Sequence, residues 1–212
     1  MPAVKKNIYF IRHAKSESNT DGIFRGTEAL LTEEGRAQAR IVAARVARIG
    51  VDAILSSTYP RAIETASIIA KDVSVPQEKH AFFGEWRHAK EIQGRHRLEP
   101  EVVRITEAWF TEHDAHDFTY SDEESFAELS GRAHTALAFL EEYAAPRLCV
   151  VTHGGFLRVL IGSMLFREAF TKPLFIRLFR HITIDNTGIT HVTYAPDEGW
   201  NLISLNDSAH LG

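Results

Sequence analysis

The chain has 212 residues, of which 44% are hydrophobic and 25% are charged, and its formal net charge is −4. This composition is typical of a globular protein with room for one sizeable core. The mild negative charge argues against a general affinity for nucleic acid or for anionic membranes. An anionic ligand would therefore need a local cluster of basic residues.

Two further features bear on the compartment. No apolar run approaches the ~18 residues that a membrane span requires, and the first residues lack the apolar core of a signal peptide. The one cysteine, Cys149, excludes an intramolecular disulfide and suits a reducing compartment. Because small thiols are commonly buried, we interpret Cys149 as filler of a buried strand rather than as a nucleophile. These features predict a cytoplasmic protein, and no feature indicates its oligomeric state.

The first quarter of the chain predicts a strand, a helix and a second strand. Residues 8–11 form a short apolar run, which is typical of a strand buried on both faces. Apolar residues then recur at steps of three and four over residues 33–49, which predicts an amphipathic helix. Thr32 suits the N-cap of this helix, and Gly50 suits its end. A brief second strand is expected at 53–55.

The middle of the chain is less regular. Pro60 suits the first turn of a helix, since its missing N–H is not needed there. We expect a third short strand around residues 80–83. Residues 84–121 are rich in charge and histidine, with a helix predicted at 99–112. A stretch of this length is atypical of an ordinary loop, so we interpret it as a functional insertion or lid.

The last part of the chain is again regular. A helical stripe of apolar residues extends through 123–143, and residues 148–152 form a second continuous apolar strand. The sequence His153-Gly154-Gly155 leads into another helix. Residues 189–194 and 200–205 resemble a terminal hairpin.

Alternating strands and helices predict an α/β fold. We expect a three-layer α/β/α sandwich, with a largely parallel sheet covered on both faces, in a single domain over residues 1–212. Ligands of such sheets bind beyond the carboxyl ends of the strands. Three segments follow strands there: Arg12-His13, Ser56–Arg61 and His153-Gly154-Gly155. We expect these segments to converge on one crevice.

The residue types in these segments suit a phosphate. The guanidinium groups of Arg12 and Arg61 offer a rigid fork of donors for a tetrahedral oxyanion, and each charge-assisted bond contributes roughly 1.5–3 kcal/mol. Gly154 and Gly155 would let backbone N–H groups approach a phosphoryl group at a helix start. A histidine at such a site can act as nucleophile, acid/base or charged donor, although a single one is more often structural.

The sequence resembles the histidine phosphatase (phosphoglycerate mutase-like) superfamily through most of its length. The matching segments, in chain order, are Arg12-His13-Ala14 with Ser16, Glu17 and Asn19; Phe24-Arg25-Gly26; "LTEEGRAQA" at 31–39; "LSSTYPRAIETA" at 55–66; Glu85; "EESFAELSGRA" at 123–133; and "THGGFLR" at 152–158. Two positions differ from the usual family pattern. Ala14 stands where the family usually has glycine, and alanine is tolerated there if its φ is negative. Lys15 stands where the family often has glutamate, and this added positive charge favours the phosphatase branch.

The resemblance implies a role for each matched residue. His13 would be the nucleophile and form a phosphohistidine. Glu85 would protonate the leaving oxygen and then activate water, a contribution of typically ~10²–10⁴-fold. The donors to the transferring oxygens would be Arg12, Arg61, a protonated His153, Asn19 and the backbone of Gly154. No metal or other cofactor is expected, because the arginines and the imidazolium supply the positive charge. Glu17 and Glu91 are alternatives to Glu85.

We therefore predict a metal-independent phosphomonoester hydrolase that acts on a small phosphorylated metabolite. A phosphoglycerate mutase-type phosphotransferase is the alternative, although the chain is short for the family's mutases and matches no substrate-closing segment. A protein that only binds a phosphorylated ligand is a second alternative, although His13, Arg12, Arg61 and His153 are all present.

Some motifs outside these segments allow two interpretations. The residues Arg87, Lys90, Arg95 and Arg97, with His88 and His96, either form a solvated basic face or contact a second anionic group of the substrate. The run "EHDAHD" at 112–117 contains metal-binding residue types, but its spacing is weak evidence and an exposed lid is preferred. Trp86, Trp109 and Phe110 are interpreted as packing residues rather than as pocket lining. Asn186-Thr187-Gly188 is interpreted as a turn without a functional role.

Overall fold

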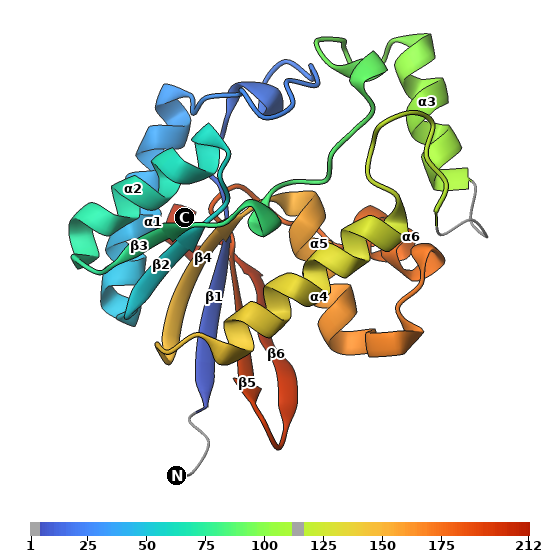
Figure 1. Ribbon diagram of the computed structural model, residues 1–212. Coiled ribbons are helices and arrows are strands. Elements are labelled where there is room, and N and C mark those ends of the chain that lie inside the picture. The colour runs from blue at the N-terminus through green and yellow to red at the C-terminus, as the bar shows by residue number, and fades with distance from the viewer. Residues whose placement is uncertain (1–4, 112–116) are drawn as a thin grey trace.

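A six-stranded sheet forms the centre of the computed structural model, which describes residues 5–111 and 117–212 (Figure 1). The strands are β1 (Lys6–Arg12), β2 (Ala53–Ser56), β3 (Gln77–Lys79), β4 (Arg147–Thr152), β5 (Ile189–Ala195) and β6 (Gly199–Asp207), in the order β3-β2-β4-β1-β5-β6. The first four run parallel, β5 runs antiparallel to β1, and β6 runs antiparallel to β5. The sheet is thus mixed, with a parallel body and the expected hairpin at one edge.

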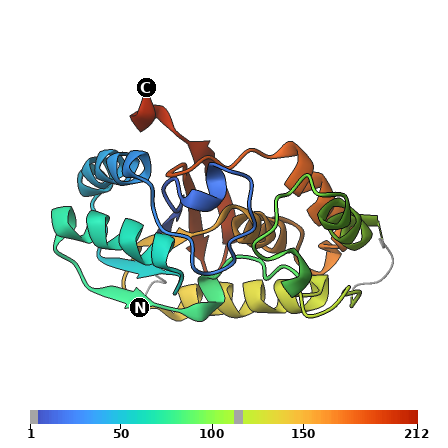
Figure 2. The ribbon, with the colours of Figure 1, turned by 90° about the horizontal axis from the view of Figure 1, so that it is seen from above.

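Helices cover both faces of this sheet, which confirms the three-layer α/β/α fold (Figures 1 and 2). The α-helices are α1 (Glu33–Ile49), α2 (Pro60–Val73), α3 (Pro100–Thr111), α4 (Phe126–Glu142), α5 (Gly154–Phe166) and α6 (Lys172–His181). The 3₁₀ helices are η1 (Glu17–Asn19), η2 (Ala81–Phe83), η3 (Lys90–Ile92), η4 (Arg167–Ala169) and η5 (Ala209–Leu211). One face of the sheet packs against α1 and α2, and the other packs against α4 and α5.

The apolar runs of the central strands serve two separate cores. Successive strand residues point to opposite faces of a sheet. In β1, Ile8 and Phe10 belong to the core under α4 and α5, whereas Ile11 belongs to the core under α1 and α2. In β4, Val150 and Cys149 divide in the same way. Because both faces are buried, these strands are apolar at nearly every position, as the sequence predicted.

The helix signals in the sequence mark the real ends of α1 and α2. The Thr32 hydroxyl accepts a hydrogen bond from the Gly35 N–H at 3.0 Å, and α1 ends at Gly50, which has a φ of 72°. Pro60 occupies the first turn of α2. The predicted helix at 99–112 corresponds to α3. The predicted helix at 123–143 is shorter than expected, because the capping box of Ser125 and Glu128 starts α4 at Phe126.

The strand predicted around residues 80–83 is wrong. The third strand is β3, which consists of three polar residues and precedes the predicted position. It lies at the edge of the sheet and pairs only with β2. Residues 81–83 form η2 instead, and the Phe82 ring packs on Phe139 of α4 with a centroid distance of 5.1 Å. The apolar signal at these positions therefore arose from packing across the sheet face and not from strand pairing.

Helix α6 had no counterpart in the sequence prediction. It begins after Thr171, carries a proline in its first turn, and buries Phe175 and Ile176. It packs against α5.

Two segments lie over the carboxyl-terminal edge of the parallel strands: residues 13–31, which follow β1, and residues 84–99 (Figures 1 and 2). They pair through an isolated bridge between Ile23 and His96, and through the hydrogen bond from the Phe24 N–H to the Arg95 carbonyl at 3.0 Å. The assignment of residues 84–121 as a lid stays a prediction. No helix in the described ranges is both long and apolar enough to cross a membrane.

Candidate active site

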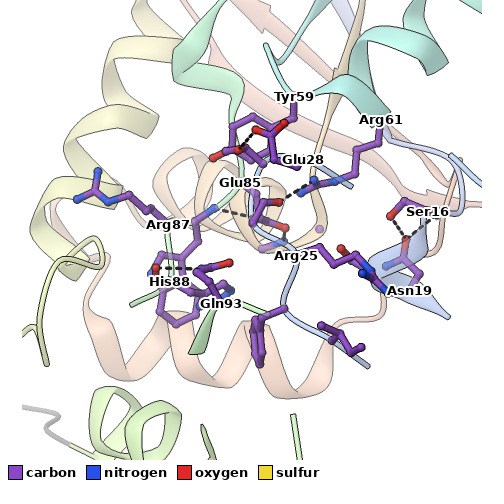
Figure 3. A pocket seen from close by; sticks show the side chains of 18 of the residues that line it. Ser16, Asn19, Arg25, Glu28, Tyr59, Arg61, Glu85, Arg87, His88 and Gln93 are labelled. Atoms are coloured by element: carbon purple, nitrogen blue, oxygen red, sulfur yellow. Dashed lines mark hydrogen bonds between the residues drawn. The ribbon is translucent and has the colours of Figure 1, made fainter. Parts of the chain in front are cut away.

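The carboxyl ends of β1, β2 and β4 open into a cavity of about 770 Å³. Six of the seven predicted site residues line it: Arg12, His13, Asn19, Arg61, Glu85 and Gly154. The seventh, His153, is fully buried behind His13, with a distance of 5.0 Å between the ring centroids. The three strand ends thus converge on one crevice, as expected. Figure 3 shows Glu85 near the centre of this cavity, with Ser16 and Asn19 on one side and Arg87, His88 and Gln93 on another.

The surroundings of His13 define its tautomer. Its Nδ1 lies 2.8 Å from the Ala14 carbonyl, which can only accept, so Nδ1 carries the proton. Its Nε2 lies 3.2 Å from Nε of Arg61, which can only donate, so Nε2 carries the lone pair. Ala14 is not among the described residues with a positive φ, so its methyl group is tolerated as expected.

The surroundings of both histidines disfavour their protonated form. Burial lowers the pKa of His13 well below its ordinary value, and the charges of Arg61 and Arg12 lower it further. Burial, followed by Arg61, His13 and Arg12, lowers the pKa of His153 in the same way. This finding differs from the expected protonated His153. The physical reason is that a buried imidazole between two guanidinium groups is costly to charge, whereas an adjacent phosphoryl dianion would act in the opposite direction.

One ring nitrogen of His153, the buried Nδ1, nevertheless has no hydrogen-bond partner among the described residues and could donate to or accept from a ligand. The Nε2 of His153 lies 2.8 Å from the Ser57 hydroxyl, which also accepts a hydrogen bond from the Tyr59 N–H at 3.1 Å. Ser57 and Tyr59 follow β2, so this loop orients the imidazole that follows β4.

The two predicted arginines reach the cavity from different elements, Arg12 from the end of β1 and Arg61 from the start of α2. Arg12, at the end of β1, donates to the Ile184 carbonyl at 2.6 Å, and its buried Nε has no partner among the described residues. Gly154 makes room for it, because a Cβ at position 154 would lie 3.3 Å from that Nε. Arg61, in the first turn of α2, also donates to the Gly26 carbonyl at 3.0 Å. Burial lowers the pKa of both arginines and Glu85 raises it, and both remain charged.

Glu85 accepts backbone hydrogen bonds at the start of α5. Its Oε1 accepts from the Phe156 N–H at 2.8 Å and from the Trp86 N–H at 3.0 Å, and its Oε2 accepts from the Gly155 N–H at 3.1 Å. A helix N-terminus favours an anion, which explains this position. The expectation that the Gly155 N–H faces the phosphoryl group is therefore wrong. Any side chain at position 155 would collide with Glu85, since a Cβ there would lie 2.7 Å from Oε1.

The other carboxylates weighed against Glu85 do not line the cavity. Glu17 is exposed and accepts from the Leu30 N–H at 3.2 Å, and Glu91 accepts from the Ser121 hydroxyl at 2.6 Å. Glu28 does line the cavity and was not considered in the sequence analysis. Lys15 pairs with Glu34 at 2.6 Å and does not line the cavity, so its charge gives no support for a phosphatase.

Asn19 is oriented by a neighbour that the sequence analysis had interpreted as a plain turn. Asn186 donates from Nδ2 to the His13 carbonyl at 2.8 Å and to Oδ1 of Asn19 at 3.3 Å. Oδ1 of Asn19 also accepts from the backbone N–H and hydroxyl of Ser16. With its oxygen so engaged, Asn19 has its Nδ2 as the donor for a ligand. The turn before the hairpin thus braces the loop that carries His13.

Two further residues of the cavity wall were not assigned in the sequence analysis. Arg158, which the matched segment "THGGFLR" contains, donates to the Gly154 carbonyl at 2.8 Å and to the Ile182 carbonyl. Tyr59 lies with its ring centroid 4.9 Å from that of His153 and 5.0 Å from Cζ of Arg61. Tyr59 closely follows a strand, and Arg158 lies in the first turns of the helix after a strand. These positions in the sequence could have identified both as site residues.

The basic segment after Glu85 divides into two groups. Arg87, His88, Lys90 and Arg97 line the cavity. Arg95 does not, because it pairs with Glu99 at 2.8 Å. His96 likewise does not line the cavity.

The remaining expectations concern packing and metals. Trp86 and Trp109 are 5% and 2% exposed with their centroids 4.2 Å apart, so they pack as predicted, although Trp86 also lines the cavity wall. Cys149 is buried in β4, and burial raises its pKa to about 12. Within residues 5–111 and 117–212 no cluster of potential metal ligands occurs. Most of the 112–117 run lies outside the described residues.

The comparisons with known proteins agree with this architecture. The chain is 30% identical over 217 residues to a protein of Enterobacter sp. (strain 638) named "Probable phosphoglycerate mutase GpmB", with 96% of this chain and 94% of the other covered. It is 27% identical over 169 residues to the adenosylcobalamin/alpha-ribazole phosphatase of Salmonella typhimurium, covering 76% and 81%. The crystal structure of phosphoserine phosphatase from Entamoeba histolytica, in complex with 3-phosphoglyceric acid, superposes with a TM-score of 0.79 at 25% identity, covering 98% of this chain and 100% of that one.

A family model extends over nearly the whole chain. The model of the histidine phosphatase superfamily, branch 1, matches residues 8–208. This range includes β1 from Ile8 onward, the whole of β2 to β6 and every residue assigned above to the cavity. The chain therefore belongs to the histidine phosphatase superfamily, branch 1.

Proposed function

We propose that this protein is a metal-independent phosphomonoester hydrolase that acts through a phosphohistidine on a small phosphorylated metabolite. The observation that carries the proposal is the position of His13 in the cavity wall, with its Nδ1–H bonded to the Ala14 carbonyl and the lone pair of its Nε2 beside Arg61. A neutral imidazole is a good nucleophile near neutral pH, where a hydroxyl would need a separate base. Relatives named as phosphatases support the same reaction class.

The first step forms a bond between Nε2 of His13 and phosphorus and breaks the ester P–O bond. The oxygens of the transferred phosphoryl group accept hydrogen bonds from Arg12, Arg61 and Nδ2 of Asn19. Arg61 thereby gives up the 3.2 Å hydrogen bond from its Nε to Nε2 of His13, and the lone pair of that Nε2 becomes available. Glu85, in its protonated form, gives its proton to the leaving oxygen. Its Oε2 accepts only one backbone N–H, whereas Oε1 accepts two, so Oε2 is the position of that proton.

The second step reverses these roles. Glu85 takes a proton from water, the water oxygen bonds to phosphorus, and the N–P bond breaks. His13 returns to its neutral form, and its Nδ1–H remains bonded to the Ala14 carbonyl throughout. The charge that develops on the phosphoryl oxygens is stabilised by donors that are already in place.

The relatives also include a protein named "Probable phosphoglycerate mutase GpmB", so phosphoryl transfer to a second hydroxyl is the competing reaction. Both reactions share the first step and differ in whether water or a substrate hydroxyl attacks the phosphohistidine. A protein that only binds a phosphorylated ligand would form no such intermediate.

The test uses purified protein, a panel of phosphorylated metabolites and p-nitrophenyl phosphate, with EDTA in duplicate wells. We expect release of inorganic phosphate that EDTA does not reduce, and an acid-labile, alkali-stable phosphoryl label on the protein. His13→Ala abolishes both turnover and label. Transfer of the phosphoryl group to a second metabolite without free phosphate would establish the mutase. Binding of a phosphorylated compound without turnover or label would establish the binding protein.

A further inference from the structure

The backbone that carries Glu85 is held by side chains from two other elements. In residues 82–85, four consecutive carbonyls accept hydrogen bonds from side chains. Thr152, at the end of β4, donates to the Phe83 carbonyl at 2.8 Å. The other three carbonyls all accept from one residue of α4, Arg132. A loop tethered at every carbonyl has little freedom to move its side chain.

Arg132 uses its whole guanidinium group for this purpose. It donates from Nη1 to the carbonyls of Phe82 at 3.1 Å and Gly84 at 2.7 Å, and from Nη2 to the Glu85 carbonyl at 3.3 Å. Its Nε and Nη2 also donate to the two carboxylate oxygens of Glu124, at 2.8 Å and 2.7 Å. An arginine has five N–H groups, so every one of them is engaged. Its exposed side-chain fraction is only 19%.

Glu124 extends the same network to the other side of Glu85. Its Oε2 accepts from the Arg87 N–H at 2.9 Å, and its carbonyl accepts from the indole N–H groups of Trp86 and Trp109. The Arg132–Glu124 pair therefore holds the chain both before and after Glu85. A largely buried ion pair with all its hydrogen bonds satisfied favours one geometry of the groups that it holds.

We infer that Arg132, with Glu124 as its partner, is the positioning residue of the general acid Glu85. This inference rests on the proposed function, because it assigns Arg132 a role only through the proton transfer at Glu85. The carboxylate of Glu85 must meet both the N–H groups of α5 and the leaving oxygen, and proton transfer demands heavy-atom distances within hydrogen-bond reach. Arg132 sets the backbone from which that carboxylate projects. The guanidinium group itself does not line the cavity.

The test separates loss of the general acid from loss of folding by comparing leaving groups. p-Nitrophenolate leaves without a proton, whereas an alkoxide does not. We expect Glu85→Gln to reduce kcat/KM for an alkyl phosphate by about 10²–10⁴-fold and kcat/KM for p-nitrophenyl phosphate far less, because kcat/KM reports the phosphorylation step and not the later attack of water. Arg132→Met is expected to lower kcat/KM for the alkyl phosphate at least tenfold more than kcat/KM for p-nitrophenyl phosphate. Arg132→Lys does not restore it, because an ammonium cannot reproduce a five-donor fork.

The double variant Glu85→Gln/Arg132→Met provides a second readout. If Arg132 acts only through Glu85, the double variant hydrolyses the alkyl phosphate no more slowly than Glu85→Gln alone. Arg45→Met is the matched control, since Arg45 forms an equivalent two-bond pair with Asp207 away from the cavity. It is expected to leave the ratio of the two rates unchanged.

Two outcomes would overturn the inference. One is an equal loss on both substrates in Arg132→Met, and the other is an additive loss in the double variant. In either case Glu85→Gln would still discriminate between the substrates, so the proposed hydrolase would stand. If Glu85→Gln itself fails to discriminate, or the wild-type protein releases no phosphate, the proposed function fails first.

Discussion

At the scale of single residues, the structure brings His13 together with Arg12 and Arg61 in one cavity wall, with the His153 ring beside the His13 ring. Burial makes protonation of the two imidazoles unfavourable, and the two arginines beside them add to the effect. The same contacts assign the lone pair of His13 to Nε2. In the proposed function, the guanidinium groups that bind the phosphate also favour the neutral form of His13 that a nucleophile requires.

The lowered pKa of His153 predicts how stability depends on pH. Because the unfolded state binds a proton near the ordinary histidine pKa of 6.5 and the folded state does not, this contribution is present above pH 6.5 and is lost as pH falls. We expect the unfolding free energy to decrease less between pH 7.5 and pH 5 in His153→Gln than in the wild type. Urea unfolding at both pH values measures it. The exposed His134→Gln is the control, and an identical decrease in wild type and His153→Gln would contradict the prediction.

At the scale of elements, the segments after the strands supply the site, and the helices hold them in place. The N-terminus of α5 binds Glu85, the first turn of α2 carries Arg61, and α4 supplies Arg132. The segment after Glu85 adds basic side chains to the cavity wall, among them Lys90 and Arg97. These two side chains are exposed, so each contributes only modestly to binding.

The position of Lys90 and Arg97 predicts their effect on substrates with a second anionic group. Charge reversal by Lys90→Glu and Arg97→Glu together is expected to raise KM for such a substrate by about two- to fivefold per residue, the range of exposed ion pairs. KM for p-nitrophenyl phosphate, which has no second anion, should change less. Arg95→Glu is the matched control, since Arg95 pairs with Glu99 outside the cavity. A KM unchanged for every doubly anionic phosphoester would show that these residues are only a solvated surface.

At the scale of the whole molecule, the cores and the site occupy different parts of the sheet. The cores cover its two faces, and the site lies at the carboxyl-terminal edge of its parallel strands. β4 lies between β2 and β1, with its apolar residues buried on both faces. The site occupies only the carboxyl-terminal edge of these strands. Central strands open with the highest free energy, so groups within them report global unfolding.

Cys149 in β4 gives a direct measure of that unfolding. Its thiol is buried and burial raises its pKa to about 12. In the folded state a reagent therefore cannot reach the sulfur, and the reactive thiolate does not form. We expect iodoacetamide to leave the native protein unlabelled at pH 8, and labelling in urea to follow the loss of far-UV circular dichroism. Cys149→Ala should retain phosphatase activity. Rapid labelling of the folded protein, or loss of turnover in that variant, would contradict this assignment.

Local patterns in the sequence were sufficient to predict much of the fold. Alternating apolar strands, the Thr32 cap, the Gly50 end and Pro60 all mark real boundaries, because each depends on residues within one or two turns. The strand expected around 80–83 failed because apolar character there reflects packing on α4, which is distant in sequence. Helix α6 was missed although Phe175 and Ile176 are buried along one side of it.

The sequence by itself determined most of the order of strands and helices, the residues placed at the carboxyl ends of the central strands, and a negative net charge that argues against general anion binding. Only the tertiary structure decided that Glu85 binds the Gly155 N–H, that Asn186 braces the His13 loop, and that Arg132 tethers the backbone of Glu85. Periodicity and capping act between residues close along the chain. These three contacts join residues 70, 173 and 47 positions apart, so no local pattern encodes them.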